Sequence, residues 1–484
     1  MLGHLVDIHY LRCVKDQVSD IDLVLKSING KIEGLTKQLN SAHEEIIVLK
    51  KENSALKSRL AVYETPKDSH NSSIPPTKES IKAQVEKSNK LLITRSLREK
   101  SAKPSGGQIG HKGVTLEMAS EPDFIEQHVP DFCAHCGNDL SNIVGSVIGI
   151  RQSIDIPLPI QAVVTEHQII AKKCSCGKCC EADFPKHVRS NISYGPNIRS
   201  IVTYFSCSQY IPYKRLTEIF HNCYGVKMSQ GTVDNILLDM EQKSEPAYQE
   251  IRARLEDSKV AGADETGVNI NGELHWGWTF QSEKLTYVFN DKSRGKVAID
   301  KHFTYGMPKT ILVSDRHASY FNMDVAGHQI CLAHILRDLT YLTDLYANQT
   351  WSSDLSKLIR ESIHKRKTEL WENIDRISIL DRFENLLIAS TDILHLKIIA
   401  IQKSLIKHKD HVFKFLFDPQ VPYDNNWSER VIRSFKIKQK ISGLFRSPNG
   451  KGADVYCHIH SITQTAKKNN QNPFLAILAV ANNF

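Results

Sequence analysis

Residues 260–281 read VAGADETGVNINGELHWGWTFQ, and here the hydrophobic pattern takes the period of β-strands. Apolar and polar residues alternate from Val260 to Ile270, which predicts a strand that is half buried. Asn271-Gly272 follows, and this dipeptide is typical of a two-residue hairpin turn because both residues tolerate positive φ angles. Strands at Leu274–Gln281 and Leu285–Phe289 continue the pattern. The sequence therefore predicts three antiparallel strands here.

Beyond these strands the pattern alternates between helix and strand. We expect a short helix near residues 295–303, an apolar strand at Lys309–Ser314, a fifth strand at His328–Leu332 leading into a helix, and a last helix at Asn425–Lys438. Three antiparallel strands, a helix, a fourth strand and a later helix is the order of a ribonuclease-H-like fold. Leu- and Ile-rich helices between residues 350 and 415 would form an insertion before the last helix.

Three carboxylates lie on separate predicted elements of this core, where they could meet at one site. Asp264 lies in the middle of the first strand, Asp315 ends the fourth, and Glu429 opens the last helix. Phosphodiester transfer needs two divalent cations about 3.5–4 Å apart, one activating the attacking oxygen and one stabilising the leaving oxygen. Mg²⁺ prefers oxygen ligands. We therefore predict that Asp264, Asp315 and Glu429 together bind two Mg²⁺ (or Mn²⁺) ions, although each acid alone is more often a cap or surface residue.

The last helix is also the most basic part of the chain. Residues 430–451 carry seven Lys/Arg and no acid. Arg433 and Lys436 share a helix face with Glu429, so they are expected to contact the phosphates that flank the scissile bond. Compensation of the helix dipole is the structural alternative. The predicted DNA-binding residues on this segment are Arg430, Arg433, Lys436, Lys438, Lys440 and Arg446.

The segment CLAHILRDL (331–339) adds two further candidates. His334 and Arg337 lie on one helix face and are predicted to touch the DNA strand being processed, with a core histidine as the alternative. Cys331-x2-His334 has half of a zinc pattern, but no partner pair is evident in the sequence. We do not expect a metal there.

Cysteines cluster in one segment. Six of the eleven fall between residues 133 and 180, which favours a metal site in a reduced compartment over a disulfide framework. A C-x2-C pair and a C-x-C pair, each followed by glycine, predict a zinc ribbon holding one structural Zn²⁺. The predicted ligands are Cys133, Cys136, Cys174 and Cys176, with Cys179 as the alternative fourth ligand.

Residues 18–63 carry a heptad repeat. The apolar positions form two sets, Val18, Leu25, Ile32, Leu39, Ile46 and Leu60, and Ile21, Ile28, Leu35, Ala42, Leu49, Leu56 and Tyr63. This spacing predicts a coiled coil, and Asn53 at a core position favours a two-stranded state. The alternative is one amphipathic helix packed on its own domain.

A second DNA-binding element is expected between the cysteines and the sheet. Tyr213–Gly225 and Ser229–Met240 resemble a helix-turn-helix, with Ser229 as the N-cap of the second helix. An ordinary helical hairpin is the alternative. Basic residues also gather from Lys78 to Lys112, where nine Lys/Arg face three Glu. The net charge of +8 is modest for this length. A polyphosphate partner is therefore predicted from the clustering of the basic residues and not from their total number.

These motifs together resemble the transposases of the insertion sequence 66 family. The matching segments are NSSIPP (71–76), GGQIGHKG (106–113), YGPNIRS (194–200), SQGTVDNIL (229–237), GADETGVNINGELHWGWTF (262–280) and DNNWSERVIRSFKIKQKISGLFRS (424–447). The resemblance implies a DDE-type transposase with Asp264, Asp315 and Glu429 as its triad. It also implies binding to double-stranded DNA at element ends and target, synapsis by a multimer, and accessory proteins of the same element. Arg316 departs from the family pattern after Asp315.

The predicted fold class is multidomain α+β, with six regions in chain order. These are a leucine-zipper coiled coil (1–64), a basic linker (65–122), a zinc-finger domain (123–190), a helix-turn-helix-like region (191–257), a ribonuclease-H-like catalytic core (258–448, with a helical insertion at about 345–420) and a C-terminal helical segment (449–484). We expect a homodimer or higher multimer through the coiled coil. A bacterial cytoplasmic, nucleoid-associated location is expected, since no run of 18 apolar residues suggests a membrane span. The alternative function is a non-catalytic zinc-finger DNA-binding regulator or an inactive transposase copy.

Overall fold

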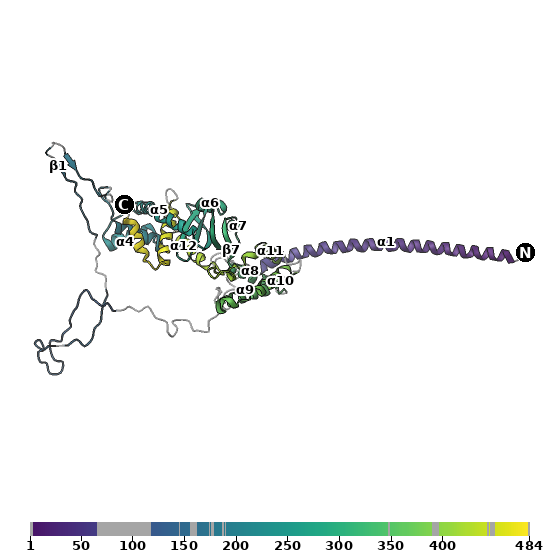
Figure 1. Ribbon diagram of the computed structural model, residues 1–484, viewed down its shortest axis with the longest axis horizontal. Coiled ribbons are helices and arrows are strands. Elements are labelled where there is room, and N and C mark those ends of the chain that lie inside the picture. Colours follow the sequence, from purple (N-terminus) through teal and green to yellow (C-terminus); the bar gives the residue numbers. More distant parts are fainter. Residues whose placement is uncertain are drawn as a thin grey trace.

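The computed structural model describes most of the chain (Figure 1). The described residues are 3–64, 118–154 except 145, 162–185 except 174 and 176–178, then 188, 190–346, 349–389, 396–442, 445 and 451–482. The predicted linker up to residue 117, with its NSSIPP and GGQIGHKG motifs, lies outside them. Among the described residues, no helix has an apolar stretch long enough to cross a bilayer.

A mixed five-stranded sheet forms the centre of the molecule, in the order β5-β4-β3-β6-β7. Its strands are β3 (Val260–Ile270), β4 (Glu273–Gln281), β5 (Thr286–Asp291), β6 (Met307–Ser314) and β7 (Val325–Ile330). β3, β4 and β5 are antiparallel, whereas β6 and β7 run parallel to β3. Asn271 (φ 50°) and Gly272 (φ 93°) form the hairpin turn as predicted. The predicted α+β character and the five strands are confirmed.

The fifth strand lies earlier in the chain than the sequence suggested. β7 begins at Val325 and ends at Ile330, whereas apolar residues pointed to His328–Leu332. Its first half contains Ala326 and Gly327, which carry little hydrophobic signal. This segment forms a strand because it pairs with β6, with Met307 opposite Val325 and Ser314 opposite Ile330.

Helices cover the sheet and close the main core. The helices that pack on its strands include α5 (Gln230–Glu256), α12 (Asn426–Ser442) and α13 (Gly452–Lys468). At the end of α6 (Lys296–His302), His302 stacks on Phe289 of β5. α13 lies on β5 and packs along α5, and α14 (Pro473–Asn482) packs on α13 and on α3 (Pro196–Thr203). Large aromatic side chains fill this core, among them Trp278, Phe280, Tyr287 and Phe289. The predicted C-terminal helical segment is thus joined to the sheet by packing.

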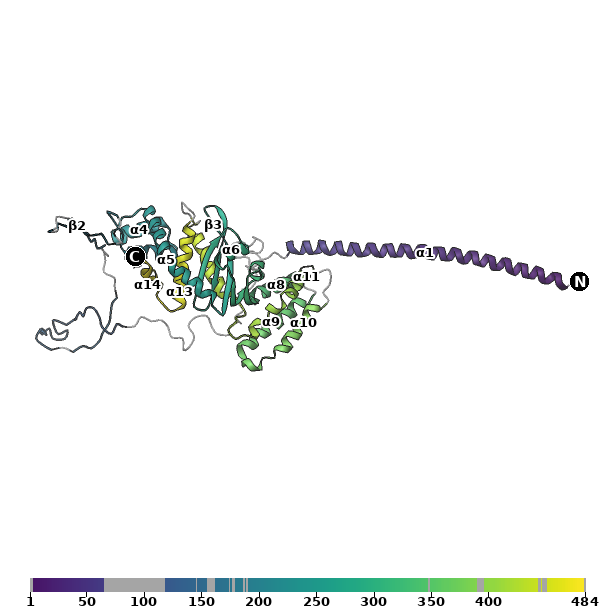
Figure 2. The same ribbon diagram turned by 45° about the horizontal axis from the view of Figure 1, so that its top comes forward.

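A second core lies in a helical lobe beside the β6–β7 edge (Figure 2). Its helices are α8 (Leu332–Leu345), α9 (Trp351–Thr368), α10 (Arg376–Ile388) and α11 (Leu396–Lys407). They pack around Leu355, Ile359 and Phe383, and Val313 and Ile330 at the strand ends join the same cluster. The helices expected between residues 350 and 415 are therefore present.

The two helices expected before the sheet are also present. α4 (Tyr213–Tyr224) ends at Gly225, which has a left-handed φ of 67°. α5 begins after Ser229, whose hydroxyl accepts from the backbone N–H of Thr232 at 3.1 Å. The predicted N-cap is confirmed, while the role of this pair in reading DNA stays a prediction.

The N-terminal region is one long helix, α1 (Gly3–Glu64), which extends away from the sheet (Figure 1). The apolar side chains described on it are exposed, including Leu25, Ile32, Leu39 and Leu49 of the predicted heptads. The exposed stripe is compatible with the predicted coiled coil, which stays a prediction.

Candidate active site

The start of α12 is tightly fixed onto β3. Asn425 donates from Nδ2 to the carbonyl of Ala263 at 2.6 Å, and Gln281 donates from Nε2 to Ser428 Oγ at 3.0 Å. A Cβ on Gly262 would lie 2.5 Å from Asn425 Oδ1 and 2.7 Å from Ser428 Oγ. A side chain at this position would have to displace Asn425 and Ser428, so Gly262 permits the close approach of α12 that positions Glu429 one turn further along.

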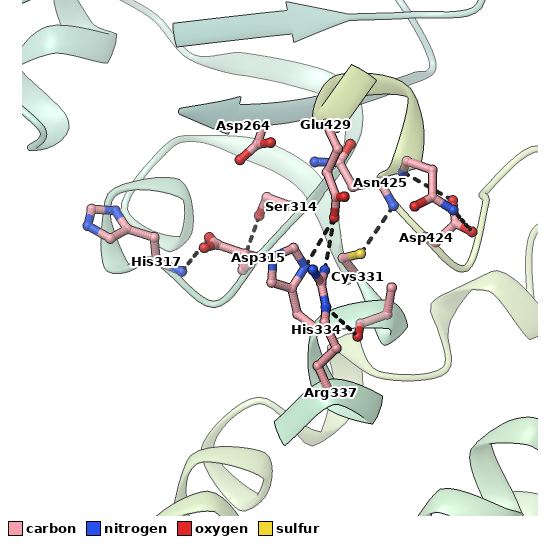
Figure 3. A network of polar contacts seen from close by, with 12 residues as sticks. Asp264, Ser314, Asp315, His317, Cys331, His334, Arg337, Asp424, Asn425 and Glu429 are labelled. Atoms are coloured by element: carbon pink, nitrogen blue, oxygen red, sulfur yellow. Dashed lines mark hydrogen bonds and ion pairs between the residues drawn. The ribbon is translucent and has the colours of Figure 1, made fainter. Parts of the chain in front are cut away.

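The sheet register brings the two predicted aspartates together. β6 runs parallel to β3 with Val313 opposite Gly262, so Asp315 follows in the row of Asp264. Asp315 accepts from the backbone N–H of His317 at 2.8 Å, which holds its carboxylate at the end of β6. Asp264, Asp315 and Glu429 thus lie in one region but come from three separate elements, and Asp264 is within the electrostatic reach of the other two (Figure 3).

The electrostatics of this cluster suit cations. Burial raises the pKa of Asp264 well above its ordinary value, and the nearby charges of Glu265, Glu429 and Asp315 raise it further. Burial and the charge of Glu265 also raise the pKa of Asp315. Like charges held close together in a poorly solvated site favour either a bound proton or a bound cation. The residues present thus fit a divalent metal, which would relieve their repulsion.

Glu429 is held by cationic side chains from both helices beside it. Arg337 on α8 donates to Oε1 at 3.0 Å, and its Nε also donates to the carbonyl of Ala333 at 3.1 Å. His334 Nδ1 lies 3.8 Å from the same Oε1 (Figure 3). Arg433 reaches Oε2 at 3.4 Å. Burial, with Arg337 next in effect, lowers the pKa of His334 to about 3, so its imidazole is neutral.

Cys331 lies under this group at the start of α8. Its Sγ accepts from the backbone N–H of Asn425 at 3.2 Å, which ties α8 to the segment before α12. Leu332 N–H donates to the carbonyl of Tyr423 at 2.9 Å and strengthens this link. Burial raises the pKa of the Cys331 thiol to about 12. The sequence did not predict that Cys331 would meet Glu429.

Three residues next to the cluster were not among the predicted site residues. The Glu265 side chain is only 2% exposed and accepts from Arg294 at 2.8 Å and from the Tyr320 hydroxyl. Glu265 is the sequence neighbour of Asp264, which was a usable signal. Arg294 and Tyr320 come from distant segments, and no pattern in the sequence indicated that they would contact Glu265.

Arg316, which departs from the family pattern, has a structural partner. Its guanidinium forms an ion pair with Asp338 on α8. The side chain therefore links the end of β6 to α8, and both of these elements carry residues of the site.

The predicted DNA-binding residues fall into two groups. Arg430, Arg433 and Lys440 are exposed on α12. Lys436 donates to the carbonyl of Gly267, and Lys438 donates to the carbonyl of Ser206 at 2.9 Å. Both ammonium groups donate to backbone carbonyls, because the face of α12 that carries them packs inward. His334 and Arg337 contact Glu429, and Arg446 lies outside the described residues.

The predicted zinc ligands are only partly described. Gly137 (φ 73°) closes a tight turn in which its N–H donates to the carbonyl of Cys133 at 2.9 Å. Hydrogen bonds from the backbone of His135 and Cys136 lower the pKa of the Cys133 thiol. This turn fits one half of a zinc ribbon. The strands β1 (Ala171–Lys173) and β2 (Cys179–Glu181) are antiparallel, but Cys174, Cys176 and the Cys179 side chain lie outside the described part.

A pocket of about 430 Å³ opens where the start of β3 meets the start of α12. It is lined by Gly262 and Val313 from the strands, by Asn425 and Trp427 at the start of α12, and by Lys259. Gly262 and Val313 lie two residues before Asp264 and Asp315, but none of the three predicted carboxylates lines the pocket.

Comparison with known families gives one match. The model described as "Transposase IS66 family" matches residues 191–453, which is more than half of the chain and includes all three predicted carboxylates. No curated protein matches the chain.

Proposed function

Because this chain belongs to the IS66 family of transposases, we propose that it cuts and joins DNA at the ends of its insertion sequence. The reaction would be metal-dependent strand cleavage followed by strand transfer. Asp264, Asp315 and Glu429 would bind two Mg²⁺ (or Mn²⁺) ions. Double-stranded DNA, both the element ends and the target, is the substrate.

The convergence of the three carboxylates carries this proposal. They come from β3, from the end of β6 and from α12. Burial raises the pKa of Asp264, and the charges of Glu265, Glu429 and Asp315 raise it further. Two divalent ions would supply activation of the attacking oxygen and stabilisation of the leaving oxygen. A sheet of order β5-β4-β3-β6-β7 followed by α12 supports a ribonuclease-H-like core, proposed at residues 258–448 with the helical lobe as its insertion.

The protein's own residues position this chemistry. Arg337 and His334 orient Glu429, and Gly262 sets the depth of α12 against β3. Arg430, Arg433 and Lys440 are exposed on the same helix, where they would contact phosphates next to the scissile bond. Lys436 and Lys438 would act through the fold, because their ammonium groups contact backbone carbonyls.

The N-terminal regions would bring DNA and partners to this core. We propose a dimer or higher multimer through the α1 coiled coil (1–64), a basic linker (65–122), a structural zinc ribbon (123–190) and a helix-turn-helix-like region (191–257). The segment Ser229–Met240 contains Asp234 and Asp239 and no Lys or Arg, so phosphate contacts would have to come from its neighbours. Accessory proteins of the same element and a place at the bacterial nucleoid complete the proposal.

Cleavage and strand transfer on DNA carrying the element's own ends test it. Wild type, Glu429→Gln and the control Glu384→Gln on α10 would be compared with and without Mg²⁺, with accessory proteins added in parallel. Wild type and the control should cut and join only with metal, whereas Glu429→Gln should bind DNA equally well and lose at least about 100-fold in rate. If all three bind alike and none cuts, a DNA-binding regulator or an inactive copy is the better account.

A further inference from the structure

A second group of metal-binding side chains adjoins the carboxylate cluster. Cys331, His334 and Glu429 each offer one ligand atom, and these atoms all lie within 4.8 Å of one another (Figure 3). Cys331 is the N-cap residue of α8 and His334 lies in its first turn, while Glu429 comes from α12. The pattern Cys331-x2-His334 looked incomplete in the sequence because its third member is distant along the chain.

We propose that Cys331, His334 and Glu429 form a site for a thiophilic divalent cation, with Zn²⁺ the best match. A thiolate, an imidazole and a carboxylate are all common zinc ligands, and three protein ligands leave a fourth position open. Mg²⁺ avoids sulfur and demands oxygen ligands. The site would therefore distinguish zinc from the magnesium of the neighbouring cluster.

The surroundings of the ligands support binding. His334 Nδ1 is buried and makes no hydrogen bond among the described residues. Cys331 Sγ accepts the backbone N–H of Asn425, the kind of donor that stabilises a coordinated thiolate. Zinc would displace the thiol proton to solvent as the Zn–S bond forms, so binding should release a proton.

Arg337 fits the site as an outer partner. Its guanidinium lies 3.0 Å from Glu429 Oε1 and would repel a cation if it were alone. However, thiolate and carboxylate together offset the two charges of Zn²⁺. Carboxylate ligands are commonly oriented by an outer hydrogen bond. Because Arg337 is also anchored on the Ala333 carbonyl, it can hold the Glu429 carboxylate in place for the metal.

Sharing Glu429 makes this site inhibitory. A zinc ion there would remove a ligand from the magnesium cluster, so zinc should inhibit magnesium-dependent cleavage. This consequence rests on the proposed function, whereas zinc binding itself does not.

Metal binding can be measured without DNA on the full chain. We would strip the protein with a chelator, load it with Zn²⁺ or Co²⁺, and measure bound metal and the thiolate-to-Co²⁺ absorption band. The background would carry Cys133→Ser and Cys136→Ser to remove the predicted ribbon. Cys331→Ser and His334→Gln should each weaken zinc binding at least about tenfold and reduce the band, because removing a ligand costs no less than removing an outer partner. Cys207→Ser, another buried cysteine, should change neither.

Unchanged zinc affinity and an unchanged band in folded Cys331→Ser or His334→Gln would overturn the proposal. Should Cys331→Ser fail to fold, His334→Gln decides, since its side chain is 20% exposed and tolerates change better. A chain that binds zinc through Cys331 yet never cuts DNA contradicts the proposed function alone. A chain that cuts DNA while both variants keep their zinc contradicts only this inference.

Discussion

Asp264 combines burial with three acidic neighbours, which gives it a measurable effect on stability. Its pKa is raised in the folded chain, so the folded state holds the proton more tightly than the unfolded state. Stability therefore falls as pH rises from the ordinary Asp value towards the raised one, and stays lower above it. Asp264→Asn should raise the Tm of the metal-free protein at neutral pH by a few degrees, since about 1 kcal/mol shifts Tm by roughly 2–4 °C in a domain of about 150–250 residues.

Calorimetry in chelator at neutral pH and near pH 4 checks this prediction. The difference between the two proteins should shrink at the lower pH, where wild-type Asp264 is protonated. Added Mg²⁺ should raise the Tm of wild type more than that of the variant. A variant that is less stable than wild type at neutral pH would mean that the Asp264 charge is already compensated.

Arg337 gives a prediction that separates two roles. The sequence placed it at DNA, whereas the structure pairs it with Glu429. If it positions Glu429, Arg337→Gln should raise the Mg²⁺ concentration needed for half-maximal cleavage by about 10–100-fold, and Arg337→Lys should recover only part because lysine lacks the planar fork. If it contacts phosphate instead, DNA affinity and its salt dependence should fall while the Mg²⁺ requirement stays the same. Arg430→Gln, on an exposed arginine of α12, serves as the phosphate-contact control.

For single side chains, the three acids were easier to predict from the sequence than the residues that contact them. Asp264 and Asp315 were predictable because a strand pattern surrounds one and precedes the other. The ion pairs of Glu429 with α8 and of Glu265 with Arg294 were not, since no periodicity links side chains from distant segments.

The junction between β3 and α12 is the element contact on which the site depends most. In Gly262→Ala, the new Cβ would lie 2.5 Å from Asn425 Oδ1 and 2.7 Å from Ser428 Oγ, so these side chains and the start of α12 that carries them would have to shift. We expect a loss of about 1–3 kcal/mol in the free energy of unfolding, together with loss of cleavage because Glu429 moves with the helix. Denaturant unfolding and cleavage assays measure the two effects.

Gly231→Ala is the matched control for that substitution. Its nearest neighbour would be Ser229 Oγ at 3.7 Å, an ordinary contact, and alanine favours the α5 helix. This control should be neutral or stabilising. If Gly262→Ala is equally well tolerated, the start of α12 is less tightly seated than the contacts imply.

Elements were predictable where one local signal fixed them. The Asn271-Gly272 turn and the alternation on either side fixed the hairpin, and Ser229 fixed the start of α5. The sequence placed β7 too far along the chain. Its first half is a strand because it pairs with β6, and no apolar run marks it in the sequence. Lys438 looked like a surface cation in a basic run, yet the face it occupies packs towards Ser206.

At the scale of the whole molecule, the fold class followed from the order of its elements. Strand order within the sheet depends on pairings such as β3 with β6, which bring residues 260 and 311 together. The helical lobe was visible as an apolar helical region, but its position beside the β6–β7 edge required the structure. The meeting of α8 with α12, which creates the surroundings of Glu429, likewise depended on this packing.

The exposed stripe of α1 leads to the prediction that concerns the assembly. Under the proposed function, two element ends would be held together for paired cutting, and a coiled coil of two chains would supply two cores. Leu35→Lys with Leu49→Lys places charges in one apolar set and should abolish pairing, because a coiled coil buries those positions. Ser27→Lys with Ser41→Lys adds the same charge outside both sets and should leave the dimer intact. Sedimentation equilibrium should give twice the chain mass of 54.8 kDa for wild type and control, and 54.8 kDa for the Leu variant. The Leu variant should still bind a single DNA end but lose paired-end cleavage. If it keeps the dimer mass, the subunits associate through another surface, and α1 must have a different partner.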